Sequence, residues 1–228
     1  MTLFLALCLP ANAYDVLTTP DGHVLSWERV PIQYSVAEAT LPDNLPGADA
    51  SIHEAFAEWS VYTSATPAFV NNGPTTTTTA APDDGNAVFF EEGWPWGSDV
   101  LALAVTWTDP TGAIAGFDLR INGSPDVPWS VNGAPGTYDL QATLTHEAGH
   151  VLGLSHSEID AATMSPTLPM GRTSKRSLHS DDRAGVDHLY PAPPTIPDST
   201  IGCSHAPSAA YLPSGFWVAA FLFRRRRS

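Results

Sequence analysis

The amino-acid sequence predicts an α+β fold, in which helices pack against a sheet. Short apolar or alternating runs, bounded by turn-forming residues, recur before residue 123 and indicate several strands. Two later segments, 137–152 and 181–190, have the spacing of helices and carry acidic residues near their starts. At 228 residues the chain is long enough for one main domain with a sizeable core.

The first third of the chain is predicted to hold a strand, a helix and a second, short strand. The strand spans 24–36, where apolar residues alternate after Pro31. The helix spans 49–63, since its apolar residues recur at helical spacing. A short strand at 67–70 is followed by a loop, 71–86, whose threonine run and low complexity give it no means of burying a core.

The rest of the main domain is predicted to hold three strands and two helices. The strands span 87–90, 100–107 and 116–122, and the helices span 137–152 and 181–190. A tight Asp-Pro-Thr-Gly turn joins the last two strands. Ser180 is the expected N-cap of the last helix.

A histidine motif, HEAGHVLGLSH at 146–156, carries the chemistry. His146 and His150 are four residues apart, so on a helix they project from one face and can share one metal ion. Glu147 stands beside them, and Gly153 can end the helix so that the chain turns and brings in His156. Three neutral nitrogens leave a fourth position for water, which is the pattern of a catalytic zinc site.

The composition excludes some function classes. The chain has 24 acidic against 10 basic residues and a formal net charge of −14. Nucleic-acid binding is not expected, because phosphate contacts need a basic face. Cys8 and Cys203 are the two cysteines and both lie outside the main domain, so its metal chemistry must rest on His and carboxylate ligands.

Both ends of the chain have the features of sorting segments. Residues 1–13 are predicted to be a signal peptide, because a short apolar run ends in Ala-Asn-Ala; a buried first strand is the alternative. The main domain then spans 14–191, followed by a linker, 192–205. Residues 206–223 are largely apolar and precede four arginines, as in a marginal membrane anchor, with a simple hydrophobic tail as the alternative.

Residues 25–191 resemble the metzincin metallopeptidases, and within them the matrixins. Besides the histidine motif, Met164 in Ala-Thr-Met-Ser-Pro stands where the family has its Met-turn, and 178–190 resembles the family's closing helix. The resemblance implies a zincin-like fold: a twisted mixed sheet with an active-site helix, a Met-turn and a C-terminal helix. It also implies a zinc-dependent endopeptidase acting on a protein or peptide substrate, as a monomer.

The resemblance also implies roles for single residues. One Zn²⁺ would be held by three histidines, His146, His150 and His156, with Glu147 as general base and acid and Met164 as an apolar floor. The substrate would lie extended along an edge strand around 102–105. The expected substrate-binding residues are Ala102, Leu103, Ala104, Pro166, Thr167 and Leu168. The loop 169–177 would set the depth of the pocket for the residue after the cut.

Some family features are not expected in this chain. Matrixins usually bind a second, structural zinc, but no histidine lies between His53 and His146, and Leu103 stands where such a ligand is expected. One zinc is therefore predicted. Calcium binding stays open through four carboxylates, although their spacing resembles no dedicated loop: Asp99, Asp109, Asp118 and Asp126. A propeptide cysteine of the kind that keeps matrixins latent is not expected, since Cys8 is the one cysteine before the domain.

The C-terminal segment resembles a myxobacterial sorting signal. Gly202-Cys203, an apolar stretch and Arg224–Arg227 follow one another in that order. The resemblance implies that Cys203 is processed or lipid-modified and that the enzyme is exported to the cell surface or beyond. Two alternatives to a peptidase remain: a zinc-stabilised surface binding module without catalysis, and a hydrolase acting on a non-peptide bond.

Overall fold

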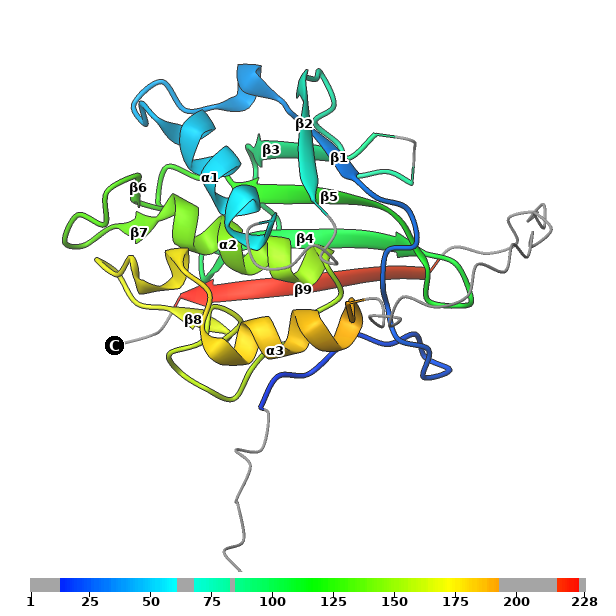
Figure 1. Ribbon diagram of the computed structural model, residues 1–228. Helices are drawn as coiled ribbons and strands as arrows, with labels where there is room; N and C mark the ends of the chain where they lie inside the picture. The colour runs from blue at the N-terminus through cyan, green and yellow to red at the C-terminus, as the bar shows by residue number, and fades with distance from the viewer. Residues whose placement is uncertain (1–12, 61–67, 83–84, 193–216, 226–228) are drawn as a thin grey trace, which may run out of the picture.

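The computed structural model describes residues 13–60, 68–82, 85–192 and 217–225. Most of the predicted signal peptide, most of the linker and Cys203 lie outside these ranges. The described residues form a seven-stranded sheet in the order β2-β1-β3-β5-β4-β9-β8, with helices α1 and α2 lying across one face (Figure 1). The predicted α+β class is confirmed.

The sheet is mixed, as expected for the zincin-like fold. Its strands are β1 (Ile32–Val36), β2 (Phe69–Pro74), β3 (Ala87–Glu91), β4 (Val100–Thr108), β5 (Ile114–Asn122), β8 (Thr167–Leu168) and β9 (Trp217–Arg225). Strands β2, β1, β3 and β5 run parallel to one another, β4 runs antiparallel to both β5 and β9, and β8 is parallel to β9. A separate pair of strands, β6 (Trp129–Ser130) and β7 (Tyr138–Asp139), precedes the helix that carries His146 and His150.

The helices fall close to the predicted ranges. They are α1 (Ala48–Ser60), α2 (Leu140–Val151) and α3 (Ser180–Leu189), with single 3₁₀ turns η1 (Glu38–Thr40) and η2 (Ser174–Arg176). The N-cap of α3 is His179 and not Ser180, because the His179 ring accepts from the Asp181 N–H while Asp182 accepts from the His179 N–H. This is a capping box with a histidine in the place of the usual hydroxyl.

Two predicted strand boundaries are wrong. The strand expected over 24–36 begins only at Ile32: Val24 and Ser26 make isolated bridges, and the chain then bends as the Trp27 N–H donates to the Tyr190 hydroxyl. The strand predicted to end at residue 70 continues to Pro74. It is an edge strand that pairs with β1 through its backbone, and its mostly exposed polar side chains give no apolar signal.

The prediction that residues 102–105 belong to an edge strand is also wrong. Strand β4 is an interior strand, because β9 pairs along its whole length on the side away from β5. Part of the apolar segment 206–223 is therefore a strand here. In the described ranges, no helix is long and apolar enough to cross a membrane. The anchor and sorting functions of this segment stay predictions.

Close packing holds α2 between α1 and the Met-turn. Ile52, Phe56 and Trp59 of α1 share one buried cluster with Leu144 and Ala148 of α2. A Cβ at Gly149 would lie 2.3 Å from Met164 Sδ and 2.8 Å from Trp59 Cζ2, so only glycine fits there. The Trp59 indole N–H donates to the Thr145 carbonyl at 2.8 Å, which fixes α1 against the turn just before His146.

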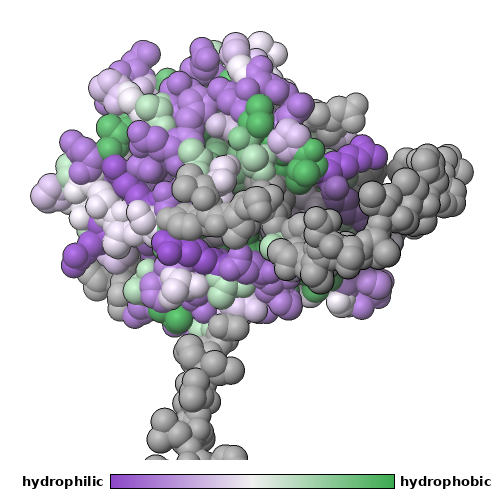
Figure 2. All heavy atoms as spheres, in the orientation of Figure 1, coloured by the Kyte–Doolittle hydropathy of each residue, from purple (hydrophilic) through white to green (hydrophobic). Residues whose placement is uncertain are grey.

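The outer surface is mostly polar on the face seen in Figure 2, with single apolar residues scattered over it. Among the described residues, the exposed large apolar side chains are Val24, Val30, Val70 and Met170. Such single residues are normal for a globular protein.

Candidate metal centre

Helix α2 begins and ends at residues that hold it firmly. Its N-cap is Asp139, whose carboxylate accepts from the Ala142 N–H at 3.0 Å. Every residue from Leu140 to Val151 is buried. Beyond the helix, Gly153 has a φ of +102°, and a Cβ there would lie 2.2 Å from the Leu25 carbonyl oxygen. Glycine is therefore required, and the chain turns at this point as predicted.

The turn brings the three predicted histidines together. His146, His150 and His156 each offer a ring nitrogen, and these atoms lie within 4.8 Å of one another. His146 Nδ1 contacts the Thr163 carbonyl at 2.7 Å, and His150 Nδ1 contacts the Leu154 carbonyl at 2.8 Å. A carbonyl can only accept, so both Nδ1 atoms are protonated and both Nε2 atoms point their lone pairs into the site.

This arrangement fits a metal cation. His146 Nε2 and His150 Nε2 are 3.0 Å apart, and two lone pairs at that distance repel unless a positive charge lies between them. Burial lowers the pKa of His146 well below its usual range and that of His150 to about 3, so both rings are neutral, as a metal requires. His156 Nε2 is buried without a hydrogen-bond partner. The three-imidazole donor set fits zinc with an open fourth position.

Glu147 lies beside the same site, fully buried. Its Oε2 accepts from the Ala104 N–H at 2.8 Å, whereas its Oε1 is buried without a partner. Burial raises the pKa of this carboxyl group well above its usual range, and the bond from Ala104 opposes the shift only in part. One oxygen is thus fixed by the sheet, and the other is left for a proton or a water.

Two carboxylates in the first turn of α3 support the site: Asp182 holds the Met-turn, and Asp181 holds the segment that follows His156. Met164 is buried, as expected of an apolar floor. Asp182 of α3 accepts from the N–H groups of Thr163 and Met164 at 2.8 and 2.9 Å, in addition to His179. Burial raises the pKa of Asp182 although three N–H donors oppose the shift. Asp181 accepts from the Ser157 hydroxyl at 2.7 Å. Helix α3 therefore positions both His156 and Met164.

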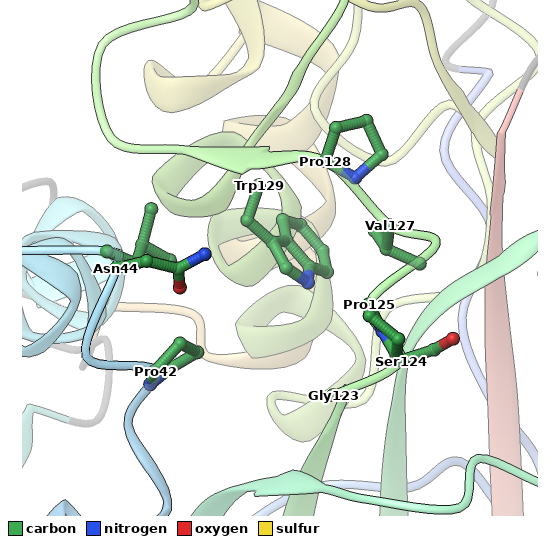
Figure 3. A pocket seen from close by; sticks show the side chains of 9 residues that line it. Pro42, Asn44, Gly123, Ser124, Pro125, Val127, Pro128 and Trp129 are labelled. Atoms are coloured by element: carbon green, nitrogen blue, oxygen red, sulfur yellow. The ribbon is translucent and has the colours of Figure 1, made fainter.

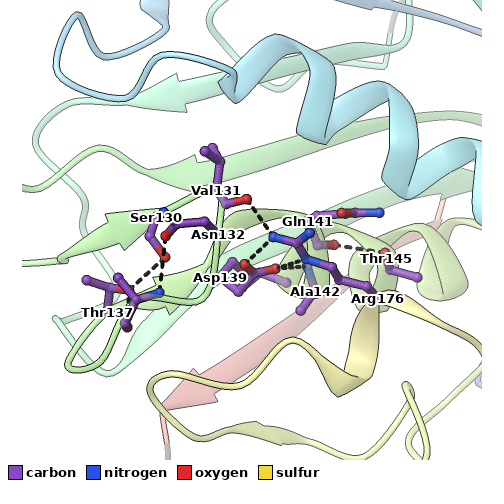
Figure 4. Close-up of polar contacts among 11 residues, drawn as sticks. Ser130, Val131, Asn132, Thr137, Asp139, Gln141, Ala142, Thr145 and Arg176 are labelled. Carbon is purple, nitrogen blue, oxygen red and sulfur yellow. Dashed lines mark hydrogen bonds and ion pairs between the residues drawn. The ribbon is translucent and has the colours of Figure 1, made fainter.

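A partly buried ion pair joins the loop 169–177 to the start of α2. Arg176 Nε and Nη2 donate to the two Asp139 oxygens at 2.8 and 2.6 Å, and Nη2 also donates to the Val131 carbonyl (Figure 4). Asp139 is fully buried and raises the pKa of Arg176. Next to it, Lys175 donates to the Ser165 carbonyl, and burial lowers its pKa to about 8. These contacts define the shape of the loop, and nothing in the sequence around Lys175 or Arg176 indicates them.

The expected substrate-binding residues lie on two sides of β9. Ala102, Leu103 and Ala104 pair with Phe223, Leu222 and Phe221, and Thr167 and Leu168 pair with Arg224 and Arg225. Ala104 belongs to the core cluster beneath α2, whereas Leu103 packs on the opposite face with Trp94 and Trp96. Leu168 is buried with Leu101, Tyr138 and Ala142, and Pro166 is exposed.

Leu103 therefore lies in an apolar cluster at the position where a second zinc ligand was considered. Two of the four calcium candidates, Asp109 and Asp118, accept hydrogen bonds from the protein. Asp109 Oδ1 accepts three bonds from Thr111 and Ala113, and Asp118 accepts from the N–H groups of Ala81 and Ala87. Within the described ranges, the one grouping of three ligand-type side chains is the histidine site.

A separate hollow of about 330 Å³ lies away from the histidines. It is lined by loop residues that include Pro42, Asn44 and Pro125, and by Trp129 of β6 (Figure 3). None of its lining residues is a histidine or a carboxylate. It has no part in the metal centre.

In the metal-free protein, acid is expected to lower the melting temperature between about pH 6.5 and 4.5. The unfolded chain protonates its histidines near the ordinary pKa of 6.5, whereas the folded site holds His146, His150 and His156 at lower pKa values. The unfolded state thus binds more protons, and stability falls as the pH falls. Glu147 and Asp182, with raised pKa values, oppose this in part. Calorimetry in chelator checks it; a melting temperature that is constant or rises towards pH 4.5 contradicts it.

Comparison with known proteins agrees with this geometry. The Matrixin family profile matches residues 26–191. Karilysin of Tannerella forsythia is 28% identical over 194 residues, covering 83% of this chain and 39% of karilysin. Human neutrophil collagenase is 29% identical over 188 residues, covering 78% and 37%. Arabidopsis thaliana metalloendoproteinase 2-MMP is 33% identical over 112 residues, covering 48% and 29%. The chain spans about two fifths or less of the length of these relatives. From the histidine site, the Met-turn and the family match, the chain belongs to the matrixins.

Proposed function

We propose that this protein is a zinc-dependent endopeptidase. The observation that carries the proposal is the convergence of three imidazoles beside a buried carboxylate with one unpartnered oxygen. A purely structural zinc site has no need of that carboxylate and more often fills the fourth position with a protein ligand. Membership of the matrixins supports the same reading, as do relatives named as a collagenase and metalloendoproteinases.

The residues present supply the parts of a hydrolytic site. Zinc held by His146, His150 and His156 would supply a Lewis acid and lower the pKa of water. Glu147 Oε1 would take the proton from the attacking water and later hand it to the leaving amine. The bond from the Ala104 N–H to Oε2 keeps the carboxylate aimed at the site during both transfers. Met164 supplies an apolar floor.

The proposed substrate is an extended peptide. It would pair with the backbone of Ala102, Leu103 and Ala104 on one side and of Thr167 and Leu168 on the other, as a strand added to the sheet. Pro166 would border the pocket for the residue after the cut, and the loop that Arg176 ties to Asp139 would close it. Export, surface anchoring, processing at Cys203, a monomeric state and calcium binding remain further parts of this proposal.

Metal removal tests the proposal. The chain is incubated with casein and with a mixture of unselected peptides, before and after treatment with a zinc chelator. We expect cleavage that stops on chelation, returns with zinc and correlates with one bound zinc per chain. A second preparation that ends at residue 216 is assayed in parallel, because β9 pairs with the β4 residues proposed to bind substrate. If both preparations bind zinc and neither cleaves any peptide bond, the proposal is wrong. That result would support the alternative of a zinc-stabilised binding module without catalysis.

A further inference from the structure

Strand β9 occupies the position that a bound peptide would need. Its backbone pairs with β4 from Val100↔Arg224 to Thr108↔Trp217, which includes the three residues of β4 proposed to bind substrate. Its other side pairs in parallel with β8 through Thr167↔Arg224 and Leu168↔Arg225. In Figure 1, β9 runs between β4 and β8, next to α2. We call the space between β4 and β8 the strand slot.

The strand slot has room for one strand only. Strands that pair lie about 4.8 Å apart, so β4 and β8 are separated by about twice that distance. The backbone on one side of β4 can pair with only one neighbouring strand. On the side away from β5, that strand is β9. An extended substrate and β9 therefore cannot occupy the slot at the same time.

Strand β9 also lies close to Glu147, the proposed general base. Ala104, whose N–H holds Glu147, is paired with Phe221 near the middle of β9. Glu147 and all nine residues of β4 are buried, as in the interior of a sheet and not at an open binding edge. A peptide substrate that reached the metal centre would have to displace β9 first.

Charge and tethering both favour this intramolecular strand. The chain has 24 acidic and 10 basic residues, and four of those basic residues are the run Arg224–Arg227 at and beyond the end of β9. A basic segment is attracted to an acidic domain at long range. Residues 193–216 join it covalently to the domain, so the pairing is intramolecular, and intramolecular pairing can reach effective concentrations on the order of millimolar. A strand of modest intrinsic affinity thus competes well with micromolar substrate.

We propose that residues 217–225 are an autoinhibitory strand. This strand blocks the strand slot of the full chain, and the slot becomes free for substrate when the strand is removed. The occupant is this named segment of the same chain. Any cleavage within 193–216 would detach it and open β4. The inhibitory role rests on the proposed peptidase function, but the pairing of β9 with β4 can be tested without measuring activity.

The first test compares three full-length chains: the parent, Ala220→Pro with Phe221→Pro, and Ala220→Ser with Phe221→Tyr. Proline removes the backbone N–H that a strand donates, whereas the control pair keeps it. We expect the proline variant to cleave a fluorogenic peptide with a kcat/KM at least about tenfold higher, mainly through a lower apparent KM. The control should match the parent. A synthetic peptide of the sequence of 217–225 should inhibit the full-length proline variant competitively.

The second test uses amide hydrogen exchange in a Glu147→Gln background, so that no chain is cut. If β9 pairs with β4, amides of 100–108 exchange faster in the proline variant than in the parent, and this result supports the proposal whether or not the protein is a peptidase. Equal exchange, or equal kcat/KM in active parent and proline variant, overturns it. Zinc-loaded variants that cleave nothing, despite faster exchange, overturn the peptidase function and with it the inhibitory role.

Discussion

Replacing Glu147 by glutamine is expected to lower kcat for peptide hydrolysis by about 10²- to 10⁴-fold, the range typical of a lost general base. Glutamine keeps the shape of the side chain and an oxygen that can accept from the Ala104 N–H, so the fold should persist. What disappears is the ability to take a proton from water at Oε1. Zinc binding should remain, because the three imidazoles are untouched.

The measurement pairs steady-state kinetics with zinc content, both on the chain that ends at residue 216. The matched control is Glu158→Gln, since Glu158 is exposed and follows the histidine motif closely. It should leave kcat within about twofold of the parent. If Glu147→Gln retains zinc and cleaves as fast as the parent, another group moves the proton and the assigned role is wrong.

Replacing Asp182 by alanine is expected to lower the free energy of unfolding by about 3 to 5 kcal/mol. Its carboxylate accepts from three backbone N–H groups, those of Thr163, Met164 and His179. Each buried donor left without a partner costs about 1 to 3 kcal/mol, and water entering the cavity recovers part of that. Because two of the donors belong to the Met-turn, zinc affinity should fall as well.

Chemical denaturation and zinc titration check this result, with Asp187→Ala as the control. Asp187 is on the same helix but exposed, so its loss should cost no more than about 0.5 kcal/mol. If Asp182→Ala folds with parental stability, the Met-turn does not depend on α3. If it is destabilised but binds zinc with unchanged affinity, α3 supports the fold without positioning the ligands.

Local spacing explains why the metal site could be predicted from the sequence. His146, Glu147 and His150 lie within one turn of a helix, so their relative positions follow from helical geometry alone. His156 followed from the turn at Gly153, and the structure shows the positive φ that this turn needs. The interior strands were also predictable, because their apolar runs are buried on both faces.

The contacts that support the site were not predictable, because they join residues far apart in the chain. Asp139 and Arg176 are 37 residues apart, and nothing in either neighbourhood marks them as partners. Asp182 was expected only to favour the start of its own helix, which is an adequate local explanation for any carboxylate in a first turn. The apolar segment 206–223, which overlaps β9, has the hydropathy of a marginal membrane span. Hydropathy alone does not distinguish such a span from a strand that pairs with a sheet.

The two carbonyl groups that orient the proposed zinc ligands have a consequence for protein engineering. Thr163 and Leu154 contact His146 and His150 through main-chain oxygens, which every amino acid provides. Side-chain substitutions at Thr163 and Leu154 therefore leave these bonds in place, and a scan of such substitutions does not measure their contribution to metal affinity. Weakening them requires a change to the backbone itself, such as an ester in place of the amide that follows each carbonyl. A designer who transfers this site to another scaffold must copy the course of two loops, and not only three histidines.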